Sequence, residues 1–387
     1  MKILHTSDWH VGKRLNNRER LSEQEDVLNE IVAVCERENV ELVLIAGDVF
    51  DTYTPSADAE RLFFKTVKKM AGNDRAVLMI SGNHDDGTRL SAATPVAEEC
   101  GVYIVGNERL PLPVDSKRKI RPIESGKGYS VFENEKGEKA FISTLPYPNE
   151  ARFKEEKSEL SYLELIQKWI AECETGNEKK YPSVFMSHLF VLGGVVSESE
   201  REIGLGGARA LPVNALPNSD YIALGHLHKK QKMGAGYCYY SGSPLQYSFD
   251  EANTEKVVKV FDLTEKGVEN LRDIPLTSGR KLMRLEATSP MLGAELLEKY
   301  PEALVELTLH LSSPLTATDK QLLSAHENLV ELRVELASEI SEDHQSRKGL
   351  SDENLFKEFY RSQYGEEASK ELLELFLSVL AETSESN

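Results

Sequence analysis

The sequence predicts an α/β fold in which two mixed sheets pack face to face between outer helices. A small α+β domain and C-terminal helices are expected to follow this sandwich. Strand and helix patterns alternate through the first half of the 387-residue chain, and the strands are almost wholly apolar, as in buried sheets. Alternating-pattern strands begin near residue 276, and a strongly helical segment with an apolar stripe ends the chain.

The first two strands are each followed by a segment with apolar residues at helical spacing. Helices are expected at 21–40 and 56–72, and the second ends at Gly72, a typical C-cap. A charged helix is expected within 151–180. The expected strands of the sandwich are 2–8, 41–48, 76–83, 183–189, 221–228, 237–244 and 256–263.

The pattern changes beyond the sandwich, where strands with alternating polarity are separated by short helical segments. A polar stretch then precedes the helical tail, as expected of a linker between two units. The sequence therefore predicts three units, at residues 1–275, 276–340 and 341–387.

Composition limits the class of protein. A hydrophobic content of 40% with 28% charged residues is typical of a globular protein. No apolar run reaches the roughly 18 residues of a membrane span, and the first residues do not resemble a signal peptide. The four cysteines lie far apart without a Cys-x-x-Cys pair, so neither a disulfide framework nor a zinc knuckle is expected. This usage favours a reducing cytoplasm.

The net charge of −18 argues against a protein that coats nucleic acid through its overall charge. It does not exclude a nuclease, because carboxylates that bind cations contribute to the negative total. A local basic groove can still face phosphates on an acidic protein.

Polar side chains that can bind metals follow several of the expected strands. Sites in α/β sheets form at the carboxyl ends of strands, and residues i and i+2 of an extended strand face the same side. Asp, Asn and His together suit divalent ions such as Mn²⁺ or Fe²⁺, whereas an all-oxygen set would favour Mg²⁺ or Ca²⁺. The candidates are Asp8, His10, Asp48, Asn83, His84, Asp85, His188, His226 and His228.

Each candidate also has a purely structural interpretation when it is taken alone. Asp8 and Asp48 could cap helices, and His188 could be a hydrogen-bonded core residue because it stands alone in its segment. The ordered set as a whole favours metal binding. His5 alternates with Ser7 along the first strand and is interpreted as structural.

The ordered motifs D-x-H, G-D, G-N-H-D, H and G-H-x-H resemble the calcineurin-like metallophosphoesterase superfamily over roughly residues 1–250. The segments ILHTSDWHVGKRL, LIAGDVFDTYTPSADA, DYIALGHLHKKQ and YSGSPLQYSFDE further resemble the SbcD family of bacterial nucleases. The resemblance implies a four-layer α-β-β-α sandwich, a capping domain at 276–340 and partner-binding helices in 341–387.

The resemblance also implies a centre with two divalent metal ions, expected to be Mn²⁺. Asp8, His10, Asp48 and His228 would hold one ion. Asp48, Asn83, His188 and His226 would hold the other, so that the Asp48 carboxylate bridges the pair.

Two further roles are implied for the residues next to Asn83. His84 would lie beside the scissile phosphate and stabilise the transition state or protonate the leaving oxygen. Asp85 would orient the His84 ring through its N–H. At the position of Asp51, the archaeal and eukaryotic branch carries a second active-site histidine. The bacterial branch lacks that histidine, as this chain does.

The activity implied is that of a DNA nuclease, with exonuclease action on double-stranded ends and endonuclease action on hairpins or single strands. Such proteins act in DNA repair and recombination as homodimers within a heterotetramer with an SbcC-type ATPase. This chain has no P-loop motif, so any ATP dependence must come from a partner.

Two other functions remain open from the sequence. The chain could hydrolyse a small phosphodiester such as a cyclic nucleotide, although the capping domain and helical tail argue against that. It could also be a binding scaffold that has lost activity, although the complete ligand set argues against that.

Two basic clusters directly follow metal motifs and are candidates for contact with DNA phosphates. They comprise Lys13, Arg14, Arg18, Arg20, Lys229 and Lys230. A third cluster, at 117–121, is more typical of a solvated loop.

The apolar stripe of the tail favours docking of its helices into a groove of a partner, which the resemblance implies is the ATPase. The stripe comprises Leu355, Phe356, Phe359, Leu372, Leu373, Phe376, Val379 and Leu380.

Overall fold

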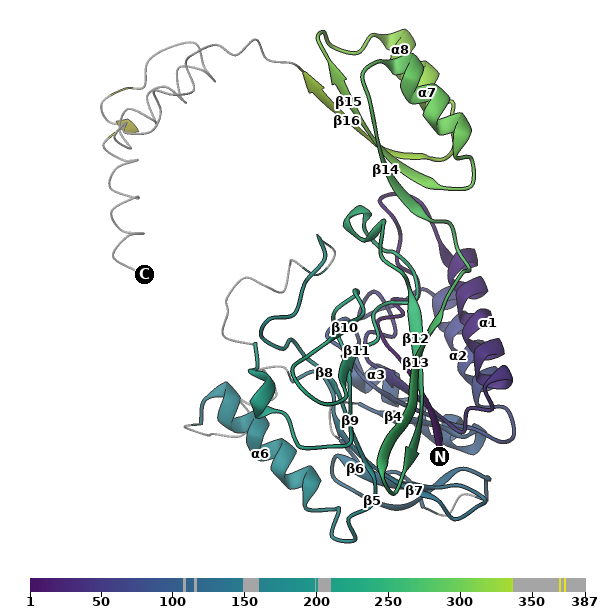
Figure 1. Cartoon of the computed structure of the whole chain (residues 1–387), viewed down its shortest axis with the longest axis vertical. Coiled ribbons are helices and arrows are strands. Elements are labelled where there is room, and N and C mark those ends of the chain that lie inside the picture. The colour runs from purple at the N-terminus through teal and green to yellow at the C-terminus, as the bar shows by residue number, and fades with distance from the viewer. Residues whose placement is uncertain are drawn as a thin grey trace.

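The computed structural model describes residues 1–106, 109–114, 117–148, 160–198, 200, 210–336, 369 and 372–373. Two sheets form a sandwich, and a smaller third sheet lies at the far end of the molecule from the N-terminus (Figure 1). The predicted α/β sandwich is confirmed.

The first sheet has six strands in the order β13-β12-β1-β2-β3-β4. Strands β1 to β4 are parallel, and β12 and β13 extend the sheet in antiparallel fashion. The strands are β1 (Lys2–Thr6), β2 (Leu42–Ala46), β3 (Ala76–Ile80), β4 (Val102–Val105), β12 (Val257–Thr264) and β13 (Gly267–Pro275).

The second sheet has seven strands in the order β10-β11-β9-β8-β7-β6-β5. Its central strands β11, β9, β8 and β7 are parallel, and the edges are antiparallel. The strands are β5 (Arg121–Gly126), β6 (Tyr129–Glu133), β7 (Lys139–Leu145), β8 (Ser183–His188), β9 (Tyr221–Gly225), β10 (Gln231–Lys232) and β11 (Cys238–Tyr240).

Helices cover the outer faces of the two sheets, which gives the four layers (Figure 1). Helices α1 and α2 pack on the first sheet, and α6 packs on the second. The Ser56 hydroxyl caps the start of α2, and Gly72 ends it at a φ of 48°, as the sequence predicts. The helices of the sandwich are α1 (Leu21–Arg37), α2 (Ala57–Ala71), α3 (Gly87–Ser91), α4 (Thr94–Ala97), α6 (Tyr162–Glu174) and the 3₁₀ turns η1 (Glu98–Cys100), η3 (Val213–Ala215) and η4 (Phe249–Glu251).

A mainly apolar layer lies between the two sheets. Leu44 and Ile80 of the first sheet share a buried cluster with Met186 and Ala223 of the second. Strands β2, β3, β8 and β9 are buried on both faces, which explains why β2 and β3 are apolar throughout.

The third sheet belongs to a small unit with the strand order β14-β15-β16. Its strands are parallel and alternate with two helices, an arrangement that the alternating pattern alone did not predict. The helices share a buried cluster with the sheet, and much of β16 is exposed. The elements are β14 (Leu282–Ala287), α7 (Pro290–Lys299), β15 (Leu304–Leu311), α8 (Ala317–Ser324) and β16 (Leu329–Leu336).

This unit packs against the sandwich near the loops that follow β1 and β11. Leu282 and Leu304 share a buried cluster with Leu15 and Phe249 of the sandwich. The Arg18 guanidinium donates a 2.8 Å hydrogen bond to the Leu329 carbonyl.

The bounds predicted for the tail unit stay a prediction. Most of the residues predicted to bind a partner lie outside the described part of the chain: Leu355, Phe356, Phe359, Phe376, Val379 and Leu380. Leu372 and Leu373 are described, and Leu373 is buried. Among the described helices, none has the length and apolar character that a bilayer crossing needs.

Candidate metal centre

The predicted metal ligands meet at the carboxyl ends of five parallel strands, three from the first sheet and two from the second. Most of their side chains are buried, and Asn83 and His84 are half-buried. The positions are Asp8 and His10 after β1, Asp48 after β2, Asn83 and His84 after β3, His188 at the end of β8, and His226 and His228 after β9.

Glycines next to the ligands allow the strand ends to approach closely. A Cβ on Gly82 would lie 2.1 Å from Asp48 Oδ1, and one on Gly225 would lie 1.8 Å from the Ala46 carbonyl oxygen. A side chain at either position would therefore push the ligand loops apart. This explains why Gly occurs in the G-N-H-D and G-H-x-H motifs.

Four of the predicted ligands adopt a backbone conformation with positive φ that is uncommon outside glycine. The φ angles are 54° at Asp8, 44° at His10, 48° at Asp48 and 112° at His226. Such conformations cost energy and concentrate at functional sites. The Asp8 and His10 side chains therefore meet because the chain turns after β1, and not because they alternate along an extended strand as predicted.

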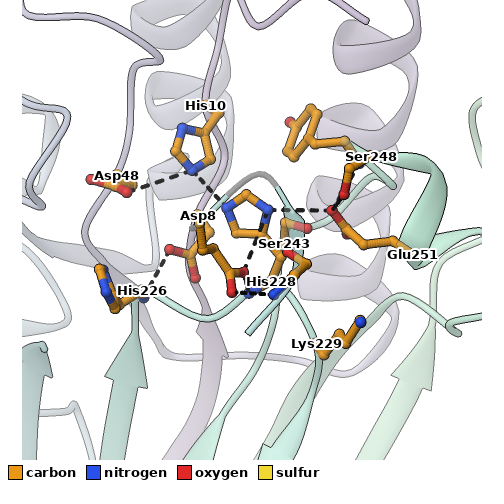
Figure 2. A network of polar contacts seen from close by, with 12 residues as sticks. Asp8, His10, Asp48, His226, His228, Lys229, Ser243, Ser248 and Glu251 are labelled. Atoms are coloured by element: carbon orange, nitrogen blue, oxygen red, sulfur yellow. Dashed lines mark hydrogen bonds and ion pairs between the residues drawn. The ribbon is translucent and has the colours of Figure 1, made fainter. Parts of the chain in front are cut away.

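Three of the residues form the first half of the centre. The ligand atoms of Asp8, His10 and His228 all lie within 4.8 Å of one another. His10 Nε2 is 3.0 Å from His228 Nε2, and the rings point toward each other (Figure 2). Asp8 Oδ1 also accepts the His226 backbone N–H at 2.8 Å, which holds the β1 and β9 loops together.

The second half of the centre gathers around the Asn83 side-chain oxygen. Asn83 Oδ1 is 2.9 Å from His188 Nε2 and 2.9 Å from His226 Nδ1. His188 Nδ1 faces the Ala46 carbonyl at 2.8 Å, and the carbonyl oxygen can only accept. Nδ1 therefore carries a hydrogen, and Nε2 is the nitrogen that faces the cluster.

Asp48 lies between the two halves. Its Oδ2 atom is 3.5 Å from His10 Nε2 and 3.3 Å from His188 Nε2. Two donors each about 2.1 Å from one ion, at an angle of about 90°, are about 3.0 Å apart, which matches the ligand spacings in both halves. The mixed imidazole, carboxylate and amide donors fit a pair of divalent ions that share one carboxylate.

Three of the six titratable groups are in the protonation state that a cation needs, and the pKa values of the other three are shifted away from it. Burial lowers the pKa of both His10 and His226 to about 3, so these rings are neutral. Burial alone would raise the pKa of Asp48, but the neighbouring His188 and His10 hold it well below its usual range. Burial raises the pKa of Asp8 to about 6, whereas Asp48 outweighs burial at His188 and raises its pKa to about 9. Metal binding would therefore release protons.

His84 lies at the edge of the centre. One of its ring nitrogens is within 4.8 Å of ligand atoms of His10 and Asp48, and its backbone N–H donates to Asp48 Oδ1 at 2.8 Å. The His84 Nδ1 atom is 2.8 Å from the Asp51 carbonyl oxygen, which fixes Nδ1 as the donor. The Asp51 carboxylate pairs with Lys13 at 2.8 Å.

The structure corrects the role predicted for Asp85. Its carboxylate accepts the backbone N–H groups of Val49 at 3.1 Å, Phe50 at 2.9 Å and Gly82 at 2.8 Å. It ties the loops after β2 and β3 together, whereas the Asp51 carbonyl orients the His84 ring. Because the buried Asp85 carboxylate already accepts three backbone N–H groups, it does not serve as the acceptor for the His84 ring.

The predicted DNA contacts are only partly compatible with the structure. Arg20 is 1% exposed and pairs with Glu23 at 2.9 Å, so the prediction that it contacts phosphates is wrong. Lys229 pairs with Asp250 at 3.0 Å, and Lys230 with Glu255 at 2.6 Å. Arg14 is 54% exposed at its side chain. Contact with DNA stays a prediction for Lys13, Arg14, Arg18, Lys229 and Lys230.

Several supporting residues were missed from the sequence. The Gln24 amide donates to the His10 carbonyl at 2.8 Å, and the Tyr247 ring lies 5.6 Å from the His10 ring. Glu251 lies behind His228. The spacing of residues within the metal motifs could not reveal these three residues, because they lie on α1 and in the segment that follows β11. The resemblance of the segment YSGSPLQYSFDE to a nuclease family was the available signal for Tyr247 and Glu251.

The fold and the paired ligand clusters define a phosphoesterase with a two-metal centre. A family model described as calcineurin-like phosphoesterase matches residues 1–230. A second one, described as type 5 capsule protein repressor C-terminal domain, matches residues 278–364. The first match covers more than half of the chain.

Curated relatives place the chain within that class more narrowly. The SbcD subunit of the nuclease SbcCD from Bacillus subtilis is 32% identical, and the alignment covers 100% of this chain and 99% of the relative. SbcD from Staphylococcus saprophyticus is 28% identical, and the alignment covers 99% of this chain and 100% of the relative. SbcD from Rhodobacter capsulatus is 33% identical, and the alignment covers 75% of this chain and 73% of the relative. The chain belongs to the SbcD family of nuclease subunits.

Proposed function

We propose that this chain hydrolyses phosphodiester bonds of DNA as the nuclease subunit of an SbcCD-type complex. The observation that carries the proposal is the position of Asp48 Oδ2, 3.5 Å from His10 Nε2 and 3.3 Å from His188 Nε2. A carboxylate shared by two ligand clusters is what a pair of ions on one phosphate requires.

The ions would activate a water and neutralise the phosphate oxygens when they are bound. Asp8, His10, Asp48 and His228 would hold one ion, and Asp48, Asn83, His188 and His226 the other. Mn²⁺ is the ion we propose, because the donors mix imidazole nitrogens with carboxylate and amide oxygens.

His84 is proposed as the catalytic residue that contacts the phosphate. Its Nδ1 donates to the Asp51 carbonyl, so its Nε2 can accept or carry a proton at the edge of the centre. His84 can therefore stabilise the transition state or protonate the leaving oxygen.

The cap and the tail favour DNA over a small phosphodiester. The cap packs on the loops that follow β1 and β11, through Leu282 and Leu304 against Leu15 and Phe249. A small substrate would not need a second unit beside the centre. An SbcC-type ATPase is the partner proposed for the tail, within a complex that contains two copies of this chain.

The experiment compares the purified chain, supplied with Mn²⁺, on a DNA hairpin, a blunt duplex and a small phosphodiester. The proposal expects cleavage of the DNA and a loss of about 10²- to 10⁴-fold in His84→Ala without loss of bound metal. Cleavage of the small phosphodiester alone would replace the proposal with the cyclic-nucleotide class. A chain that binds no metal would be a scaffold.

A further inference from the structure

A buried carboxylate lies behind the metal ligand His228. The Nε2 atom of this ring is 3.0 Å from His10 Nε2, and Nδ1 on the other side lies 3.4 Å from Glu251 Oε1 (Figure 2). Glu251 is 0% exposed. Because a carboxylate accepts, Nδ1 carries the hydrogen and the Nε2 lone pair is directed into the cluster.

Lys256 holds both this carboxylate and the backbone of the same histidine. Its Nζ contacts Glu251 Oε2, donates to the His228 carbonyl at 2.9 Å and donates to the Ser243 hydroxyl at 2.8 Å. An ammonium has three hydrogens, so all of its donors are used. One buried ion pair therefore fixes His228 at its ring and at its backbone.

Further bonds hold Glu251 in place. Its Oε1 accepts the Tyr247 backbone N–H at 3.3 Å and lies 2.9 Å from the Ser248 hydroxyl, whose hydrogen it shares with Asp250. Glu200 also approaches His228 Nδ1, but at 3.6 Å, and its Oε1 accepts the His228 backbone N–H. Glu251 is thus the nearer carboxylate to the ring.

We propose that Glu251 and Lys256 are positioning residues that set the metal affinity of the half-site formed by Asp8, His10 and His228. Burying an ion pair costs desolvation energy and seldom increases stability over apolar packing, which leaves orientation of the ligand as its function here. This inference rests on the two-ion centre proposed above and is independent of the substrate that the centre cleaves.

The test measures Mn²⁺ binding to the metal-free full chain by calorimetry. Wild type is expected to bind two ions. Glu251→Ala should weaken one of them by about 10- to 100-fold, the range found for other groups that orient a ligand, and leave the second unchanged. Lys256→Met should act in the same direction. Glu251→Gln should restore part of the affinity, because its amide oxygen can still accept the Nδ1 hydrogen.

A double-mutant cycle separates action through His228 from a general effect. His228→Ala should weaken the same half-site, and adding Glu251→Ala to it should cause no further loss. If the two losses multiply instead, Glu251 does not act through His228 and the proposal fails.

Asp273→Asn provides a matched control. Asp273 Oδ1 pairs with Lys259 at 2.7 Å, and Lys259 is a buried lysine on β12, three residues after Lys256. Asp273→Asn should bind two ions like wild type, with thermal unfolding recorded for every variant. If Asp273→Asn weakened Mn²⁺ binding as much as Glu251→Ala does, the loss of metal affinity would reflect a loss of fold stability, and the proposal would fail. If wild type itself bound fewer than two ions, the proposed function would fail first.

Discussion

At the scale of single residues, three neighbours in the G-N-H-D motif have three different roles. Asn83 contacts two histidines of the metal cluster, His84 lies at its edge, and Asp85 accepts three backbone N–H groups. Gly82 allows the turn to pack against Asp48. Because the side chains of adjacent residues point in different directions, one short turn can supply a proposed ligand, a proposed catalytic group and a structural support.

Asn83→Ala removes a proposed ligand and should weaken Mn²⁺ binding strongly. The loss should exceed the roughly 10- to 100-fold found when a residue that hydrogen-bonds to a ligand is removed. His84→Ala should keep the wild-type affinity, because His84 is proposed to contact the phosphate and not to hold an ion. Calorimetry with Mn²⁺ on both variants measures the difference. Equal loss of metal in His84→Ala would make this residue a ligand.

Asp85→Ala should lower the free energy of unfolding by at least about 2 kcal/mol, because the backbone N–H groups of Val49, Phe50 and Gly82 lose their acceptor. Urea unfolding of the metal-free protein measures it. The neighbouring Asp86 caps α3 at an exposed position, so Asp86→Ala should cost about 1 kcal/mol. Unchanged stability in Asp85→Ala with loss of cleavage would restore the orienting role predicted from the sequence.

At the scale of elements, the loop after β1 links the candidate metal centre to the small unit of β14, β15 and β16. Arg18 donates to the Leu329 carbonyl of this unit, and Arg20 contacts the Gln246 carbonyl in the loop after β11. The Gln246 side chain in turn accepts the Leu282 backbone N–H at 2.8 Å. Basic residues in a loop next to a metal motif can thus serve the packing of two units.

Arg20→Met and Arg14→Ala should separate packing from DNA contact. Arg20 is buried with Glu23 and Gln246, so Arg20→Met should destabilise the fold by about 3 kcal/mol by leaving buried partners unpaired. Arg14 is exposed, so Arg14→Ala should keep the stability and reduce the salt dependence of DNA binding by about one phosphate contact. Urea unfolding and DNA titrations at several salt concentrations test both. An unchanged salt slope in Arg14→Ala would remove this residue from the DNA surface.

Elements built from local patterns could be predicted from the sequence, and contacts between distant segments could not. The apolar strand β2 follows from a continuous apolar run, and the position of Asp48 in the cluster follows from the rule that sites form at strand ends. Asp85 was misassigned because its partners Val49 and Phe50 belong to another loop. Sequence spacing also gave no sign that Arg20 turns inward.

At the scale of the whole molecule, the centre depends on how the two sheets are held together. His5 of β1 spans them, since its Nδ1 is 3.0 Å from the Tyr221 hydroxyl and its Nε2 is 3.2 Å from the Leu224 carbonyl, both on β9. A neutral ring satisfies both bonds, with Nε2 donating and Nδ1 accepting. The structural role predicted for His5 is confirmed.

His5 should therefore make the stability of the sandwich depend on pH. Burial lowers the pKa of His5 from 6.5 to about 3, so the unfolded chain binds this proton more readily than the folded one. Its contribution is constant above about pH 6.5 and is lost as the pH falls toward about 3. Between about pH 7.5 and 5.5 wild type should lose about 1.4 kcal/mol through this residue.

His5→Gln isolates the effect, because glutamine can still donate to the Leu224 carbonyl and does not titrate. The free energy of unfolding of the metal-free protein, measured in urea at both pH values, should fall less in His5→Gln than in wild type by about that amount. Metal must be absent, because metal binding is itself pH-dependent and would add its own change in stability. Equal losses in the two proteins would mean that the His5 ring accepts a proton within the fold, and that the sheets can separate enough to admit it.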